Sequence, residues 1–363
     1  MTNTQKLLLN SISDSLWRNR QASALPAELL DEARLHAVDG LIQPVSYEKI
    51  AFFIRYTYAE KQLIDLLNTN NVPFVILKGT AAAIYYPEPY RRSFGDIDFL
   101  VPAEFFSEAI QLMKSDGYSE AKVQGDLERE YVFIKDGYAF ELHKCFSYPD
   151  LDIEQYVSEG VEKRETAHIN EHEFPMLPPL ANGIVLLAHM RAHLKSGIGL
   201  RQVIDWMMYC AKVLDEEFWS SSFKPVLDDL GLTTLAVTAA ALCQRYLGLT
   251  DSITWCCEAD EALVDQLLRV LLSSGNFGVK NSSGNNVETV TAAIRSHGLF
   301  RYLQHAGENN WTLYHRYSWL RPLCWLYQVF RYIRQGIGRG NKLKEDLRRG
   351  NDRYELLKRL GIS

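Results

Sequence analysis

Apolar residues recur every three or four positions along much of the chain, the spacing that predicts amphipathic helices. The first forty residues contain two such segments. Leu8, Ile12 and Leu16 mark the first, and residues 27–38, which follow Pro26, form the second. We therefore expect residues 1–44 to form an N-terminal helical segment.

A longer amphipathic stretch follows Pro44. Ser46 is a suitable N-cap, because its hydroxyl can accept a hydrogen bond from a backbone N–H at the start of a helix. The apolar positions from Ile50 to Leu67 keep helical spacing, and the stretch ends before Pro73. One long helix is predicted here.

The pattern changes to that of a sheet after Pro73. Short apolar runs predict buried strands, and Asp136-Gly137 predicts a tight hairpin turn because both positions tolerate positive φ angles. Helical spacing returns near Pro178 and continues to the end of the chain. The predicted strands are 74–77, 97–101, 130–134 and 138–146; the predicted helices after Pro73 are 81–85, 102–116, 183–195, 200–214, 235–247, 261–272, 320–334 and a charged segment beyond Gly340.

These elements predict an α+β fold, in which helices flank a mixed β-sheet and a mainly α-helical C-terminal domain follows. We expect the α/β domain at residues 45–175. The helical domain, with its basic C-terminal tail, then spans 176–363.

Composition narrows the class of protein. The 363 residues are 47% apolar and 23% charged, as in soluble globular proteins. No apolar run approaches the roughly 18 residues of a membrane-spanning helix, and the leucines near the start are too few for a signal-peptide core. The six cysteines lack metal-binding spacing. We expect reduced thiols, a cytoplasmic location and no integral insertion into a membrane.

Charge is distributed unevenly. From Phe300 onward, 13 Arg and Lys face five Asp and Glu, although the whole chain has a net charge of −6. Such a tail permits contact with phosphates, RNA or anionic lipids. Residues 319–332 are apolar almost all round, which favours burial against other helices over a position on a membrane surface.

Acidic residues on two predicted strands provide the candidate chemistry. Asp96 and Asp98 point to the same side of their strand, because side chains alternate between the two faces. Glu141 shares a face with His143 on a later strand. Carboxylates this close repel one another unless a cation lies between them, and Mg²⁺ prefers carboxylate oxygens. If the strands are neighbours, Asp96, Asp98 and Glu141 form a metal site.

Two features of this site depend on residues elsewhere. In another strand register, Asp126, Glu128 or Glu130 would take the place of Glu141. A glycine before a helix lets the backbone approach a phosphate, and basic side chains nearby add positive charge. The candidate nucleotide-binding residues are Lys78, Gly79, Thr80, Arg91, Arg92 and Ser93.

The segment Leu77-Lys78-Gly79-Thr80, followed by Asp96-Ile97-Asp98 and a later strand carboxylate, resembles the nucleotidyltransferase superfamily that includes DNA polymerase β. It is most similar to a bacterial, largely uncharacterised family with a Leu-Lys-Gly turn and an Asp-Ile-Asp strand. The resemblance extends over about residues 47–209. The loop 85–95 is longer than in compact members of the superfamily.

The resemblance implies an enzyme that transfers a nucleoside monophosphate from an NTP such as ATP, with Mg²⁺ or Mn²⁺. The acceptor is an unknown small molecule, protein or RNA. The resemblance makes Asp96, Asp98 and Glu141 the catalytic residues and metal ligands, and it places Gly79-Thr80 against the phosphates. Two alternatives remain: a non-catalytic nucleotide-binding scaffold on the same fold, and a toxin-like enzyme that modifies tRNA or protein.

Four residues of the later helices are candidates for the wall of a cleft. His189 and His193 lie four residues apart on one helical face, but a zinc site would lack a third ligand. Arg201 and Asp205 have the same spacing. An intrahelical ion pair is the simplest role for them, and contact of Arg201 with the nucleotide or acceptor is the alternative.

Overall fold

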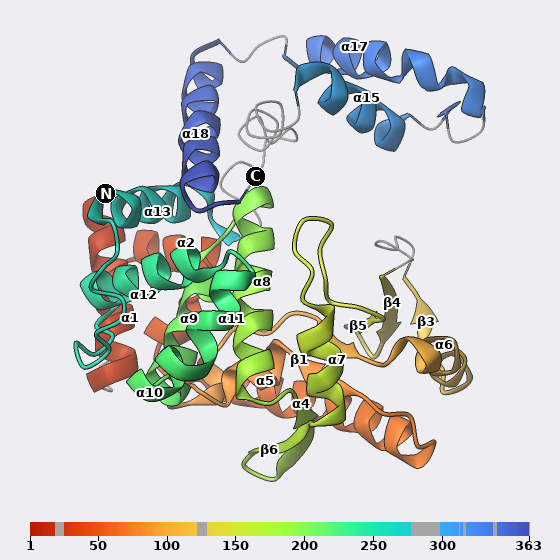
Figure 1. Ribbon diagram of the computed structural model, residues 1–363, viewed down its shortest axis with the longest axis vertical. Helices are drawn as coiled ribbons and strands as arrows, with labels where there is room; N and C mark the ends of the chain where they lie inside the picture. The colour runs from red at the N-terminus through yellow and green to blue at the C-terminus, as the bar shows by residue number, and fades with distance from the viewer. Residues whose placement is uncertain are drawn as a thin grey trace.

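The computed structural model describes residues 1–18, 25–121, 129–276, 298–311, 313–314, 317–336 and 340–362. Within these residues, seven strands form one mixed sheet in the order β3-β4-β5-β2-β1-β7-β6, with helices around it and a larger helical region beside it (Figure 1). The predicted α+β class is confirmed, whereas the domain boundaries stay predictions. The strands are β1 Val75–Leu77, β2 Ile97–Leu100, β3 Ser119–Glu120, β4 Glu130–Lys135, β5 Tyr138–His143, β6 Glu165–Ile169 and β7 His172–Met176.

The middle of the sheet is buried on both faces. β1 and β2 pair antiparallel, and β2 also pairs with β5 in parallel. Ile97 and Phe99 are fully buried, as the alternation along this strand predicts. The strand that carries Asp98 is therefore held from both sides by neighbouring strands.

The predicted hairpin is confirmed. β4 and β5 pair antiparallel, and the turn between them has positive φ angles at Asp136 (51°) and Gly137 (83°). Both signs are those of the tight turn that Asp-Gly favours. The turn fixes which residues of β4 lie opposite β5.

A second hairpin, β6–β7, was not predicted. Its apolar residues alternate with polar ones, so that Ala167, Ile169, Phe174 and Met176 are buried. β7 joins the sheet parallel to β1. In a sequence pattern, a proline such as Pro175 argues against a central strand. β7 nevertheless lies inside the sheet, because it pairs with β1 through a single pair of residues.

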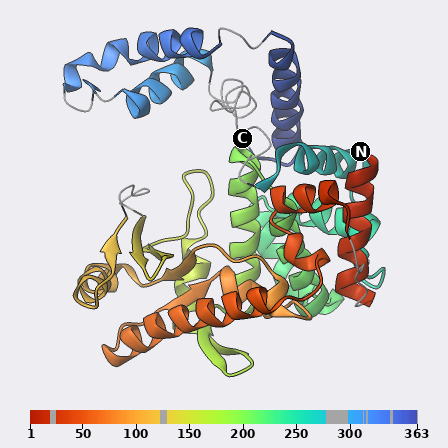
Figure 2. The same ribbon diagram turned by 180° about the vertical axis from the view of Figure 1, so that it is seen from behind.

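The long helix α4 (Tyr47–Thr69) begins as predicted, since the Ser46 side chain accepts a hydrogen bond from the backbone N–H of Lys49. α4 packs on β7 and α6, and Figure 2 shows it running along this side of the sheet. α5 (Gly79–Ala83) starts two residues before the predicted helix, directly after β1. The remaining short elements here are the 3₁₀ turns η1 Pro89–Arg91 and η2 Ala103–Phe105, and α6 Phe106–Ser115.

The helical region confirms the predicted helices 183–195, 200–214, 235–247 and 261–272 to within a few residues. Several short elements between them were not predicted, including a π-helical turn, η3. Predicted and unpredicted elements together, this region consists of α7 Glu154–Glu162, α8 Pro179–Ser196, α9 Leu200–Val213, α10 Glu216–Phe218, η3 Trp219–Phe223, α11 Lys224–Asp229, α12 Thr233–Leu247 and α13 Glu261–Ser274.

The N-terminal helices are part of this helical region. They are α1 Asn3–Arg18, α2 Ala27–Leu35 and α3 Asp39–Ile42. α1 packs on α12, and the indole nitrogen of Trp17 donates a hydrogen bond to the Leu247 carbonyl at 2.7 Å. In Figure 1 the red helix α1 lies beside α12.

The described residues after Gly298 contain α15 Leu299–Asn310, η5 Ser318–Leu323, α17 Cys324–Gly336 and α18 Gly340–Arg359. Part of the basic tail is internal. Arg353 is fully buried and donates to the Ser274 hydroxyl at 2.6 Å, and Arg359 pairs with Asp260 at 2.8 Å. The predicted burial of residues 319–332 is wrong in part, because Trp319 and Phe330 are exposed. Across the described residues, no helix combines the length and the apolar character needed to cross a bilayer.

Candidate active site

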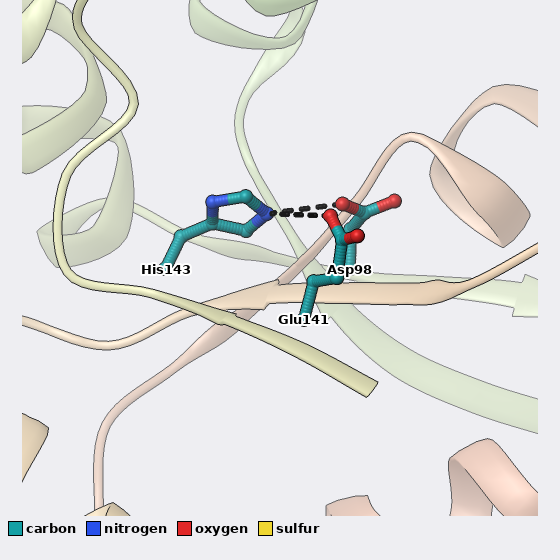
Figure 3. A group of neighbouring side chains, drawn as sticks. All are labelled: Asp98, Glu141 and His143. Carbon is teal, nitrogen blue, oxygen red and sulfur yellow. Dashed lines mark hydrogen bonds and ion pairs between the residues drawn. The ribbon is translucent and has the colours of Figure 1, made fainter. Parts of the chain in front are cut away.

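Neighbouring strands bring the acidic residues together. β2 and β5 are parallel neighbours, and Asp98 lies opposite Glu141 in their register. The strand pairing on which the predicted site depends is therefore confirmed. Figure 3 shows the side chains of Asp98, Glu141 and His143 turned toward one another, and one ligand atom of each lies within 4.8 Å of those of the other two.

His143 links the carboxylates. Its Nε2 lies 3.0 Å from Oδ1 of Asp98 and 3.8 Å from Oε2 of Glu141. Its Nδ1 lies 3.7 Å from Oε2 of Glu130, which is its partner in the β4–β5 register. Glu130 therefore lies beside His143 and does not replace Glu141, while Asp126 and Glu128 lie outside the described residues.

Lys78 supplies the positive charge nearest to these groups. It stands between β1 and α5 with a φ of 52°, a left-handed conformation that is uncommon for a side chain other than glycine. Its Nζ lies 2.5 Å from Oδ1 of Asp98, and both side chains are buried. This backbone conformation places the Lys78 side chain against the end of β2.

The Lys78–Asp98 pair is charged at neutral pH. Burial alone would raise the pKa of Asp98, but the Lys78 ammonium and the hydrogen bond from His143 lower it well below its ordinary value. Burial likewise opposes the charge on Lys78, but Asp98 and Asp96 raise its pKa overall. Each partner thus holds the other in its ionised form.

Glu141 behaves differently. Burial, together with the negative charges of Asp98 and Asp96, raises the pKa of Glu141 to about 9. The Lys78 ammonium pairs with Asp98, whereas Glu141 keeps its proton at neutral pH. The site has the charge deficit that a bound cation would remove.

A cavity of about 150 Å³ lies over these groups. The sheet and the turn form one wall, and α8 and α9 form the opposite wall. The lining residues are Lys78, Gly79, Arg92, Gly95, Asp96, Asp98, Glu141, His189, His193 and Arg201. The cavity therefore gathers candidates that lie as far as 123 positions apart in the sequence.

The two histidines of the cavity are neutral. Their rings pack edge to face with centroids 4.3 Å apart. Burial, reinforced by the charge of Lys78, lowers the pKa of His193 to about 4 and that of His189 well below its ordinary value. Among the described residues, neither histidine belongs to a group of three side chains that could ligate one metal ion. The zinc alternative therefore finds no support.

Comparison with known proteins decides the family. The model of a family described as uncharacterised nucleotidyltransferase matches residues 51–248, more than half of the chain. The chain belongs to this nucleotidyltransferase family. The match runs from α4 to α12 and so includes every residue that lines the cavity. The resemblance seen in the Leu-Lys-Gly and Asp-Ile-Asp segments is confirmed.

Other comparisons are more distant. A crystal structure of an antigenic nucleotidyltransferase-like protein from Paracoccidioides brasiliensis is similar to 57% of this chain and 96% of its own, at 15% sequence identity and a TM-score of 0.33. No curated protein matches the chain.

Asp205 does not form the expected ion pair within α9. Instead Arg92 donates two hydrogen bonds to its carboxylate, both 2.8 Å long, and the Tyr86 hydroxyl donates a third at 2.7 Å. All three side chains are buried. This contact joins the loop 85–95 to α9, and it holds Arg92 at the edge of the cavity. Arg201 also lines the cavity, close enough to Arg92 that burial and the second guanidinium lower its pKa.

The turn residues Gly79 and Thr80 have structural contacts. The Thr80 hydroxyl is buried and donates to Glu60 at 2.7 Å, so it does not face the cavity. Glu60 also contacts His172 at 2.7 Å. A Cβ at position 79 would lie 2.9 Å from the Tyr56 hydroxyl, which itself donates to the Asp96 carbonyl. Glycine is needed here for packing, independently of any phosphate.

Arg91 and Ser93 lie on the far side of the loop from the carboxylates. Both line a separate cavity of about 270 Å³, together with aromatic residues of α4 and the loop. The Arg91 side chain is buried, pairs with Glu88 and points to the carbonyls of residues 41 and 43. Arg92 lines both cavities, whereas Arg91 and Ser93 do not line the one over the carboxylates.

The sequence patterns assign no role to His143 or Tyr86, although both contact carboxylates at or beside the cavity. For His143 a signal exists, because strand alternation places it on the face of Glu141. For Tyr86 no local signal exists, since its partner lies 119 residues away.

Proposed function

We propose that this chain transfers a nucleoside monophosphate from an NTP to an acceptor, with a divalent cation at Asp96, Asp98 and Glu141. One observation carries the proposal: Asp98 and Glu141 lie in register on parallel strands, with Asp96 beside them on one cavity wall. The family supports transferase chemistry, and the site supplies the residues for it.

The residues suit Mg²⁺ or Mn²⁺. Both ions favour carboxylate oxygens, and three carboxylates here share one cavity. Burial first, and then the charges of Asp98 and Asp96, raise the pKa of Glu141. Such an ion, when bound, would polarise the phosphate oxygens and activate the attacking group.

The chain's own residues would then bind and orient the substrate. Lys78, Arg92 and Arg201 place three cations around the cavity, which suits the charge of a triphosphate. In the transfer, the acceptor oxygen bonds to the α-phosphorus and the bond from that phosphorus to the β-phosphate oxygen breaks. Pyrophosphate leaves, and the acceptor proton passes to a cavity carboxylate and then to water.

The test uses α-labelled NTPs with a cell extract as the source of acceptor. The purified chain should release pyrophosphate and place label on an extract component. Asp96→Asn and Glu141→Gln should each lower this transfer about a thousandfold, equivalent to several kcal/mol of barrier. Glu173→Gln, the same change on exposed Glu173 of β7, should leave it unchanged.

The choice of variants follows from the ion pair. Replacing Asp98 would strand the buried Lys78 ammonium and cost about 3–5 kcal/mol of stability, which would confuse loss of activity with unfolding. Transfer by Asp96→Asn and Glu141→Gln at the wild-type rate would contradict the proposal. Calorimetric binding of NTP and Mn²⁺ without pyrophosphate release would instead indicate a non-catalytic nucleotide-binding protein.

A further inference from the structure

The C-terminal hairpin, defined here as α15, η5 and α17, lies outside the residues that match the family. Its helices pack closely, because Gly307 of α15 has no room for a side chain against the Cys324 backbone. Cys324 and Gln328 of α17 are buried in this contact. Figures 1 and 2 both show the hairpin apart from the sheet, on the same side of the molecule as α18.

The opposite face of η5 and α17 is an exposed apolar stripe. It consists of Trp319, Leu323, Leu326 and Phe330. Leu323, which directly precedes α17, Leu326 and Phe330 are three and four residues apart, which places them along one side of this helix. Trp319 precedes them in the 3₁₀ segment η5. Their exposed fractions are 73%, 43%, 46% and 67%. A stripe of this size on a surface indicates a binding face.

The hairpin is cationic as well as apolar. Residues 298–336 contain five Arg and a single acidic residue, Glu308. Arg321 donates to Glu308 at 2.8 Å and so neutralises it. Arg331 follows Phe330 directly, and Arg334 lies one turn beyond it on the side of the stripe. Positive charge therefore borders the end of the apolar stripe.

Aromatic residues are concentrated in the same segment. Ten of its 39 residues are Phe, Trp or Tyr, against 12% in the whole chain. Trp and Tyr favour the interface between lipid and water, because their rings are apolar and their polar ends reach water. An amphipathic helix with Trp, Leu and Phe on one face and arginines at its border has the composition of an interfacial helix.

We propose that the C-terminal hairpin docks on the surface of an anionic phospholipid membrane through the stripe. Charge selects this occupant: the four arginines besides the Arg321–Glu308 pair attract anionic headgroups, and a second copy of the hairpin would bring four more and repel the first. Residues 1–297 carry 26 Lys and Arg against 40 Asp and Glu. The acidic body is therefore repelled from the same surface, and the hairpin is the part that contacts it. This inference does not depend on nucleotidyl transfer.

The experiment is flotation of the full chain with vesicles. The chain should float with vesicles of phosphatidylcholine and 30% phosphatidylglycerol, and remain unbound with phosphatidylcholine alone. Raising the salt to 0.5 M should release it, because screening weakens attraction to the headgroups. Failure to float with the anionic vesicles would overturn the proposal, and so would equal flotation with both types.

Paired variants identify the surface. Leu326→Ser with Phe330→Ser should lower vesicle partitioning at least about tenfold, and Arg331→Gln with Arg334→Gln by a similar factor. The matched control is Ile54→Ser with Tyr58→Ser, which changes two equally exposed residues of α4. It should float like the unmodified chain. Unchanged melting by circular dichroism verifies that the variants are folded, since the altered apolar side chains are exposed.

Two further outcomes would overturn the proposal. If the stripe variants float normally, another surface binds the vesicles. If light scattering shows a dimer that the stripe variants convert to a monomer, while the chain does not float, a second copy covers the stripe.

Discussion

Asp98 and Glu141 stand on paired strands and Asp96 directly precedes β2, whereas the residues expected to hold the phosphates stand on a turn and a loop. The first group meets as the strand pattern predicts, with Asp98 opposite Glu141. The residues of the second group have separate partners: Lys78 pairs with Asp98, Thr80 with Glu60, and Arg92 with Asp205. Side chains on paired strands have fixed neighbours, but those of a loop find partners wherever the tertiary structure offers them. The comparison implies that the strand half serves the reaction and that much of the loop half serves the fold.

Among the substitutions that test the loop half, Arg92→Ala should cause the largest loss of stability. It removes both hydrogen bonds to Asp205 and leaves that buried carboxylate with Tyr86 alone. The free energy of unfolding, measured with urea, should fall by about 3–5 kcal/mol. Arg34→Ala, which breaks an exposed Arg–Asp pair, should cost less than about 1 kcal/mol. Equal effects of the two substitutions would mean that Arg92 has no structural role.

Lys78→Met tests the residue shared by the two halves. Without the ammonium, the buried Asp98 carboxylate keeps its hydrogen bond with His143 but loses its charged partner, and we expect a loss of about 3 kcal/mol in the free energy of unfolding. Mn²⁺ should stabilise this variant more than the unmodified chain, because the ion would replace the missing positive charge. Thermal unfolding with and without Mn²⁺ measures both effects. Identical stabilisation of the two proteins by Mn²⁺ would separate Lys78 from the cation site.

The pKa of Glu141 predicts how the strand half responds to pH. This pKa is raised from 4.5 to about 9, so the folded chain holds a proton that the unfolded chain has lost. Without metal, stability should therefore decline as pH rises from about 4.5 to about 9. Binding of Mn²⁺ must displace that proton, so its apparent affinity should rise about tenfold per pH unit between pH 6 and 8. Titration of Mn²⁺ followed by electron paramagnetic resonance measures the slope, which Glu141→Gln should abolish.

Thr80→Val should cause the smallest loss of stability among the tests of the loop half. It removes a buried hydrogen bond to Glu60 and should cost about 1–2 kcal/mol of stability. Turnover per folded molecule should not change, because the hydroxyl does not line the cavity. A raised KM for NTP at unchanged stability would indicate that Thr80 contacts the phosphates, and it would contradict the structural role given to the loop half.

The parts of the molecule that the sequence predicts well depend on short-range rules. Alternation along a strand puts Glu141 and His143 on one face, Asp136-Gly137 sets the hairpin, and Ser46 starts α4. These outcomes depend on residues within a few positions of one another. Their reliability comes from backbone geometry.

The predictions that fail depend on contacts distant in sequence. Asp205 was assigned to Arg201, four residues away, but its partner Arg92 lies 113 residues away. The hairpin β6–β7 escaped because Pro175 and several charged residues conceal its alternation. The exposed face of α17 could not be distinguished from a buried one, because apolar content alone does not reveal whether another helix covers it.

The packing of α1 on α12 has a practical meaning for anyone who dissects this molecule. The family match begins at residue 51, which invites expression of a shortened fragment from there. Such a fragment would lose Leu8, Ile12 and the indole of Trp17, and it would lay bare the apolar surface of α12 that they cover. Aggregation of the fragment would then result from the loss of α1, which covers the apolar surface of α12. It would say nothing about the chemistry of the cavity.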